Sequence, residues 1–276
     1  MKKTNIVLAI ILFCVAINAQ EKSEFSTYLG GGMSSLKYGT NVGDFKHGGG
    51  GMLGFGYTFF FTELLGAGTG VEFALYNSRI SFDGHKVAEF PATAAGENFL
   101  FRSAVSDFEE HSRAVLLQVP LMLRLNFAGT QTHKFYAGVG GKIALPLGAK
   151  TRASSATLTN SAFFPEDNAE FTDLPHIGLS TYHSDSFEKK LDFRPTGFVS
   201  AEAGVKFKLK DGLSFFTGIY FDYGLKRLLD QRGRNFGNMV EYDSKNPNDF
   251  AISSVFDSFV EEVIPMAIGV KAGLSF

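Results

Sequence analysis

The chain has little of several residue types that other classes of protein need. Its 276 residues include no tryptophan, eight prolines and one cysteine, Cys14, which lies in an apolar N-terminal run. The rest of the chain therefore has no cysteine for a disulfide or a thiol nucleophile. A lipoprotein cleavage site at Cys14 would need a small residue just before it, and Phe13 stands there. The formal net charge of −2 gives no indication of a nucleic-acid partner.

The N-terminus is typical of an export signal. Two lysines precede an apolar run at residues 6–17, and cleavage is expected after Ala19. Residues 1–19 are then a signal peptide, and residues 20–276 form one domain, because no change in composition marks an internal boundary. Loss of the two lysines shifts the formal charge from −2 to −4. No later segment reaches the roughly 18 to 20 apolar residues of a transmembrane helix, so a membrane-spanning part must consist of strands.

Phenylalanine and glycine are abundant instead, with 30 and 31 residues, and they recur in segments of two-residue alternation. The segment from Val115 to Phe127 is apolar at every odd position, whereas its even positions include Gln118 and Arg124. The last segment, from Met266 to Phe276, alternates in the same way. One apolar and one polar face, in segments of about ten residues, are typical of strands in a transmembrane β-barrel.

The same alternation predicts six further strands. They cover residues 25–36, 46–59, 64–82, 135–150, 196–210 and 213–226. Short linkers alternate with long ones at 37–45, 84–111, 151–194 and 227–262. We therefore predict an all-β fold, an eight-stranded antiparallel up-and-down transmembrane barrel with long extracellular loops. An even number of strands places both termini on the short-turn side, which is periplasmic in bacterial outer-membrane barrels.

Aromatic residues mark one end of the predicted strands. On the outward face, the position nearest the short turns is phenylalanine in seven strands and Leu65 in the eighth. This pattern is typical of an aromatic girdle at the periplasmic interface. The alternative, a soluble β-sandwich, would bury these rings in its core. The predicted girdle residues are Phe25, Phe59, Phe127, Phe135, Phe207, Phe215 and Phe276.

The inward face collects charges of both signs. Eight strands enclose a space about wide enough for side chains to fill, so charges inside it must be paired. We expect an internal ion-pair network that fills the barrel. The alternatives are a gated proton or ion path and a small-solute pore. The residues predicted for the network are Glu72, Arg124, Lys142, Glu202, Lys206, Asp222 and Lys271.

Candidate catalytic and metal-binding residues are few. The six histidines fall in predicted loops, turns or strand ends, and none has the spacing of a His-Glu-x-x-His helix. His176, His183 and Asp185 share one long loop, yet we predict no metal site there. Ser180, Ser184 and neighbouring residues suggest a lipid-modifying hydrolase, but a catalytic triad requires a defined geometry. We therefore expect neither an enzyme nor a cofactor.

The fourth long loop has apolar residues at helical spacing between Ile252 and Val263, and residues 246–249 are suited to a helix start. A short amphipathic helix at the barrel mouth or on the outer leaflet is one interpretation. The other is that the last strand begins early, and the sequence leaves residues 250–263 open between the two.

Two short segments carry a family resemblance. Leu117 to Leu123 reads Leu-Gln-Val-Pro-Leu-Met-Leu, and residues 222–225 read Asp-Tyr-Gly-Leu. The first is similar to the Leu-x-Ile-Pro-Leu strand of the PorT-like outer-membrane β-barrel family of Bacteroidota. The terminal Phe276 and cleavage before Gln20 agree with this resemblance. It implies an eight-stranded barrel and, since the namesake is implicated in type IX secretion, a role in the cell envelope.

These observations predict a non-enzymatic outer-membrane barrel whose extracellular loops bind a partner or ligand or assist a secretion system. A narrow channel or transporter for small or apolar solutes is the alternative. The expected partners are outer-membrane lipid, the barrel-assembly machinery through the C-terminal strand, and an envelope protein.

Overall fold

The computed structural model describes residues 23–39, 43–94, 96–127, 129–130, 132–210, 212–225, 228, 239–243, 246–260 and 262–276. The predicted signal peptide, residues 1–19, lies outside the described residues. Within these ranges, no helix has the length and apolar character needed to cross a membrane.

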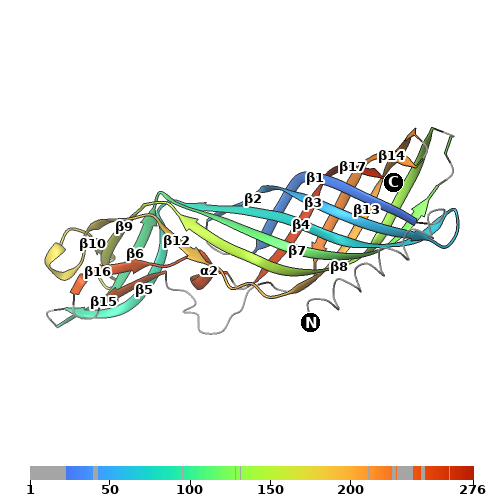
Figure 1. Cartoon of the computed structure of the whole chain (residues 1–276). Helices are drawn as coiled ribbons and strands as arrows, with labels where there is room; N and C mark the ends of the chain where they lie inside the picture. Colours follow the sequence, from blue (N-terminus) through green and yellow to red (C-terminus); the bar gives the residue numbers. More distant parts are fainter. Residues whose placement is uncertain are drawn as a thin grey trace, which may run out of the picture.

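Eight long strands form one closed sheet (Figure 1). Each pairs antiparallel with both neighbours in chain order, and the first strand pairs with the last, Ser26 lying opposite Ser275. The predicted eight-stranded up-and-down barrel is therefore confirmed, and the β-sandwich alternative is wrong. The strands are β1 (Ser23–Tyr38), β3 (Gly49–Phe60), β4 (Leu65–Phe82), β7 (Phe108–Asn126), β8 (His133–Ala153), β13 (Thr196–Lys210), β14 (Leu213–Gly224) and β17 (Val263–Ser275).

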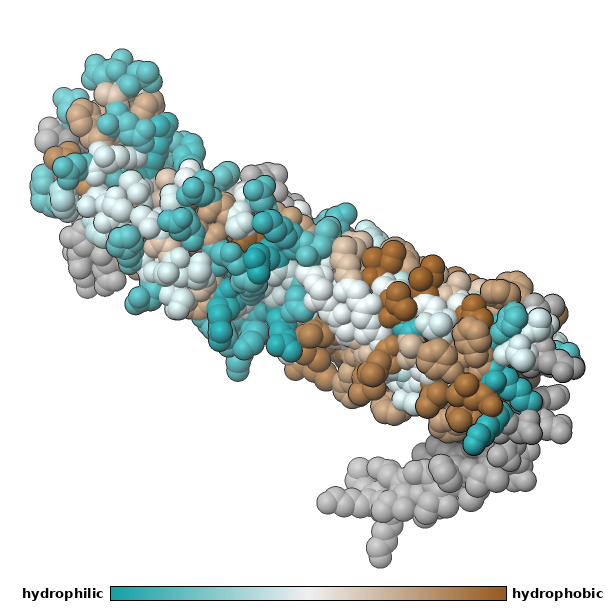
Figure 2. Space-filling view, turned by 90° about the horizontal axis from the view of Figure 1, so that it is seen from above, coloured by the Kyte–Doolittle hydropathy of each residue, from teal (hydrophilic) through white to brown (hydrophobic). Residues whose placement is uncertain are grey.

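The barrel presents its apolar face to the outside. Leu121 is 70% exposed, and Leu29, Ile143 and Ile219 are also exposed, although a water-soluble fold would bury such side chains. On the face seen in Figure 2, hydrophobic side chains gather over the barrel half of the molecule, in a region that we call the apolar band, and a hydrophilic zone follows toward the other end. A band of this kind matches the hydrocarbon layer of a bilayer.

Three strands extend well beyond this band. The strands β4, β7 and β8 contain 18, 19 and 21 residues, more than the roughly 9 to 11 that a tilted strand needs to cross a membrane. The predicted start of the fourth barrel strand at Val115 is therefore too late, because β7 already begins at Phe108. The extensions carry two short edge strands, β2 (Asp44–His47) on β4 and β12 (Phe187–Lys190) on β8.

The predicted strand over residues 46–59 is divided. Residues 44–47 form β2, which pairs with residues 78–81 of β4, and β3 begins only at Gly49. Gly48 stands at the break, where an added Cβ would lie 2.1 Å from the carbonyl oxygen of Asn77. This close backbone approach requires glycine and ends the regular pairing.

The long connections at this end are folded. A second sheet contains β5 (His85–Ala94), β6 (Glu97–Ser106), β9 (Ala156–Phe164), β10 (Ala169–Phe171) and β11 (Thr181–Ser184). A hairpin of β15 (Val240–Asp243) and β16 (Asn246–Ile252) comes from the fourth connection. We call these seven strands, together with the 3₁₀ turn at Pro175–Ile177, the lobe. The lobe lies at the far end of the extended strands (Figure 1).

The question left open for residues 250–263 has a mixed answer. A single helical turn, α2 (Val255–Ser258), forms, and Ser254 caps it by accepting a hydrogen bond from the Phe256 amide. Residues 246–249 belong to β16, so their predicted role as a helix start is wrong. Val255 and Phe256 are fully buried, so the turn is part of the core at the barrel mouth.

Candidate functional site

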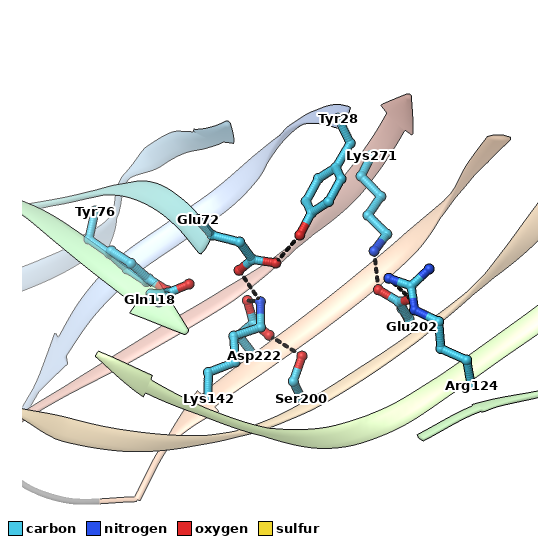
Figure 3. A network of polar contacts seen from close by, with 10 residues as sticks. All are labelled: Tyr28, Glu72, Tyr76, Gln118, Arg124, Lys142, Ser200, Glu202, Asp222 and Lys271. Carbon is cyan, nitrogen blue, oxygen red and sulfur yellow. Dashed lines mark hydrogen bonds and ion pairs between the residues drawn. The ribbon is translucent and has the colours of Figure 1, made fainter. Parts of the chain in front are cut away.

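Inside the barrel lumen, one cation lies between two carboxylates (Figure 3). The Nζ atom of Lys142 lies 2.6 Å from Glu72 Oε2 and 2.9 Å from Asp222 Oδ2. These residues come from β8, β4 and β14, so the contacts cross the interior. All three side chains are at least 96% buried. Ser200 donates a hydrogen bond to the other Asp222 oxygen.

A second cluster lies beside the first and has the opposite composition. Glu202 on β13 forms an ion pair with Lys271 Nζ of β17. The Nη2 atom of Arg124 on β7 lies 3.2 Å from Glu202 Oε1. Here one carboxylate lies between two cations. The two clusters together contain three acids and three bases, so their formal charges cancel. Balanced pairing is what burial in a low-dielectric interior requires.

Tyr28 of β1 joins the two clusters. Its hydroxyl donates a 2.6 Å hydrogen bond to Glu72, and Lys271 Nζ lies 4.9 Å from the centre of its ring. Above the Lys142 cluster, Gln118 donates to the Tyr76 hydroxyl at 3.0 Å. Polar and aromatic side chains from most of the barrel strands thus point into the same stretch of the lumen, from Gln118 at one end to Arg124 at the other (Figure 3).

Glycines make room for these lumen side chains. An added Cβ at Gly54 would lie 2.3 Å from the Tyr28 ring, and one at Gly138 would lie 2.9 Å from the Glu202 side chain. Both positions face the lumen, opposite large side chains on the neighbouring strand. Larger residues there would displace the groups that hold the charges.

Six of the seven charged residues predicted for the lumen lie in these two clusters. The seventh, Lys206, instead pairs with Glu24 at 2.5 Å near the short-turn end. That end opens into a basin of about 720 Å³ lined by further lysines, including Lys134, Lys208 and Lys210. Sequence reasoning missed Glu24, Tyr28 and Ser200. All three have inward parity, which is the signal that points to them.

The seven predicted girdle residues all lie at the short-turn end of the barrel. Six are 36% to 61% exposed, and Phe59 is partly buried. Ring pairs connect several of them, with Phe25 against Phe276 and Phe207 against Phe215, both at 6.4 Å between centroids. Tyr57 and Phe61 add to the ring by contacting Phe25 and Phe59.

The opposite mouth of the barrel is closed around a buried carboxylate. Glu110, on the extension of β7, accepts hydrogen bonds from Thr151 and Ser254 hydroxyls, both at 2.6 Å, and from the Val255 amide at 2.9 Å. Burial raises the pKa of Glu110 above its usual range, although the three hydrogen bonds act to lower it. This carboxylate fastens the fourth connection to β7 and β8.

The lobe carries its own polar and apolar contacts. Arg102 pairs with Glu89 at 2.7 Å, and its guanidinium lies 3.7 Å from the centre of the Phe163 ring. The hydrogen bonds from Lys86 and Arg102 hold the pKa of Glu89 below its usual range. Large apolar side chains remain exposed on the lobe. They are Phe90, Phe171, Leu174 and Ile177.

His183 and Ser184, which the sequence singled out, lie in ordinary strand contacts. His111 and His183 lie within strands rather than in loops, and His183 Nδ1 is 3.3 Å from the Thr157 hydroxyl. Ser184 instead exchanges hydrogen bonds with the Ala156 backbone. In the part of the chain that the structure describes, no three residues of the types His, Cys, Asp and Glu are placed to hold a metal ion.

Several solved structures of outer-membrane proteins are similar to the chain at low identity, and three of them each cover 92% of it. Neisserial surface protein A is 10% identical, with a TM-score of 0.37 and 94% of its chain covered. OprG from Pseudomonas aeruginosa is 11% identical, with a TM-score of 0.38 and 96% of its chain covered. A major outer membrane protein from Thermus thermophilus is 13% identical, with a TM-score of 0.38 and 99% of its chain covered.

The sequence itself gives a more specific assignment. No curated protein matches the chain. Residues 18–230, more than three quarters of the sequence, match the family described as outer membrane protein beta-barrel domain. The chain therefore belongs to the outer membrane protein beta-barrel domain family.

Proposed function

We propose that this protein is a non-enzymatic barrel that exposes its lobe at the cell surface and binds a partner there. One observation carries the proposal: the lumen is filled by balanced ion pairs, while three long connections fold into an ordered lobe. Long connections of bacterial outer-membrane barrels face outward, so both termini then face the periplasm.

A narrow channel is the second function considered, and the lumen favours it less. A solute moving along the axis would have to separate Lys142 from Glu72 and Asp222, all of them buried. Separating a buried ion pair leaves uncompensated charges in a low-dielectric interior, at a cost of about 3 to 5 kcal/mol for each broken pair. The interior thus supports a structural role for these residues.

The exposed apolar side chains of the lobe are the best candidates for partner contact. Phe90 and Phe171 are 38% and 51% exposed, and aromatic anchors of this kind contribute much of the binding energy at protein interfaces. The resemblance of residues 117–123 to the PorT-like family supports an envelope protein, such as a secretion component, as the partner. The alternating strand that ends at Phe276 supports recognition by the barrel-assembly machinery during insertion.

Site-specific photo-crosslinking in living cells tests the proposal. A photoreactive phenylalanine analogue at Phe171 or Leu174 is expected to give a discrete protein adduct. The same analogue at Leu121, which is 70% exposed within the apolar band, serves as the control and is expected to give none. Absence of an adduct at both lobe positions in correctly inserted protein would contradict partner binding through the lobe.

A further inference from the structure

A group of cationic side chains lies on the outer surface where the apolar band ends and the extended strands begin. Each of these side chains is exposed. They come from five neighbouring strands of the same sheet, β2, β4, β7, β8 and β12. We name this group the basic belt. It consists of Lys46, Arg79, Arg113, Lys150, Arg152 and Lys190.

Strand register places these cations directly beside one another. Arg113 of β7 lies opposite Lys150 of β8, and Lys150 lies opposite Lys190 of β12. One step farther from the band, Lys46 lies opposite Arg79. Like charges at directly opposed positions destabilise a sheet. A row of three such cations therefore indicates a surface adapted to an anionic partner.

Acidic side chains neutralise only part of the belt. Glu188 accepts from Lys150 and Arg152 at 3.0 and 2.9 Å, and Glu109 lies 3.3 Å from Arg79. Asp44, opposite Ser81, is the third acid of this surface. The six cations of the belt against these three acids leave a formal charge of +3. Asp192 and Arg194, which follow β12, add one charge of each sign.

Two belt residues are available for an external anion. Among the described residues, neither Arg113 nor Lys190 forms an ion pair, and both side chains are exposed. They lie on either side of Lys150 in the row nearest the band. Three donors are therefore spaced across adjacent strands, about 5 Å apart from one strand to the next.

The height of this row identifies the kind of anion. Arg113 is two residues beyond Val115, which has the same outward parity as the lipid-facing Val119 and Leu121. Leu147, 57% exposed, precedes Lys150 by three residues. At a rise of about 3.3 Å per residue, the cations lie about 7 to 10 Å beyond the apolar band along strands that are tilted in the membrane, so they reach the level of lipid headgroups.

We infer that the basic belt binds the phosphate groups of the phosphorylated glycolipid of the outer leaflet, the lipid A part of lipopolysaccharide. The inference rests on the proposed placement of the lobe outside the cell. Arginine and lysine at headgroup level attract anionic lipids, and the arginine guanidinium suits a phosphate because it donates two parallel hydrogen bonds. The acyl chains of the same lipid lie against the apolar band below.

Native mass spectrometry of the full chain, titrated with diphosphorylated lipid A in detergent, tests this inference. The triple variant Arg113→Gln, Lys150→Gln, Lys190→Gln is expected to bind at least about tenfold more weakly, because each cation at an anionic lipid surface contributes roughly fivefold. The matched control changes Lys134, Lys208 and Lys210 to glutamine, which removes the same charge at the opposite end of the barrel. Its affinity for lipid A is expected to be that of the parent.

The chemistry of the lipid provides the second comparison. Lipid A without phosphates is expected to bind as weakly as the triple variant does, and phosphatidylglycerol, the anion of the opposite leaflet, is expected to bind less well than diphosphorylated lipid A. Equal binding of lipid A by the parent and by the triple variant would overturn the inference, as would equal binding of the dephosphorylated lipid. A preference for phosphatidylglycerol would overturn the outer-leaflet assignment. Protease treatment of whole cells tests the outward placement of the lobe separately.

Discussion

The ammonium group of Lys142 lies 2.6 Å from a carboxylate oxygen of Glu72, although the two residues are 70 positions apart and their strands are not paired with each other. Because Lys142 also contacts Asp222, its ammonium group lies between two buried acids. Without Lys142, both acids lose their ion-pair partner inside the barrel.

Replacing Lys142 by methionine is expected to destabilise the folded barrel by about 3 to 5 kcal/mol, because removal of one partner leaves buried charge uncompensated. Urea titration of the refolded protein in lipid, followed by heat-modifiable gel mobility, measures the change. Adding Glu72→Gln and Asp222→Asn to the same variant removes the unpaired acids and is expected to restore most of the loss. Equal stability of the single and triple variants would contradict the charge argument.

Gly54→Ala is expected to destabilise the barrel by about 1 to 3 kcal/mol, as overpacking of a filled interior commonly does. The added methyl group would lie 2.3 Å from the Tyr28 ring and would displace the hydroxyl that donates to Glu72. Gly148→Ala is the matched control, because nothing lies within 4 Å of its added Cβ. Similar urea midpoints for the two variants would argue against a close-packed lumen.

The closed mouth is expected to respond to pH through Glu110. Its pKa is raised in the folded protein by burial, so the folded state binds the proton more tightly than the unfolded chain does. Between the pKa of Glu110 in the unfolded chain and its pKa in the folded protein, the closed mouth therefore gains stability as the pH falls and loses it as the pH rises. Hydrogen exchange of the Val255 amide, which donates to Glu110, reports this local stability.

Two substitutions separate the charge of Glu110 from its hydrogen bonds. Glu110→Gln keeps an acceptor and is expected to abolish the pH dependence. Glu110→Ala leaves two hydroxyls and one amide without their acceptor and is expected to increase exchange at every pH. An unchanged pH dependence in Glu110→Gln would assign the effect to another group.

The absence of tryptophan makes the depth of the barrel in the membrane measurable with single reporters. Tryptophan in place of Phe135, at the short-turn rim, is expected to be quenched most strongly by lipids brominated near the headgroup. In place of Leu121, within the apolar band, it is expected to be quenched most strongly by lipids brominated near the chain end. The reverse order would contradict the assignment of the band.

Much of the barrel could be predicted because a lipid-facing strand must alternate. The parity of Val115 to Phe127 fixes which residues face the lumen, and the short turns fix the strand count. Which lumen charges meet could not be predicted. Glu72 and Asp222 reach Lys142 from strands that do not pair with β8, so their meeting depends on the stagger of the whole sheet.

The strand extensions and the lobe could not be predicted, for a different reason. Beyond the membrane the outward face becomes polar, as at His111 and Arg113, so the apolar alternation that marks a strand ends while the strand continues. The alternation therefore predicts a loop at Glu110, although this residue lies in β7. The pairing of the lobe strands joins segments from separate connections, as where β6 pairs with β9.

Planar-bilayer recording of the purified full-length protein tests the central claim, that this is a closed barrel with its function on the surface. The buried pairing of Lys142 with Glu72 and Asp222, and of Arg124 and Lys271 with Glu202, predicts no steady unitary current at moderate voltage. Reproducible unitary conductance from the parent protein, altered in size by Lys142→Met, would contradict the claim and assign a pore to the lumen.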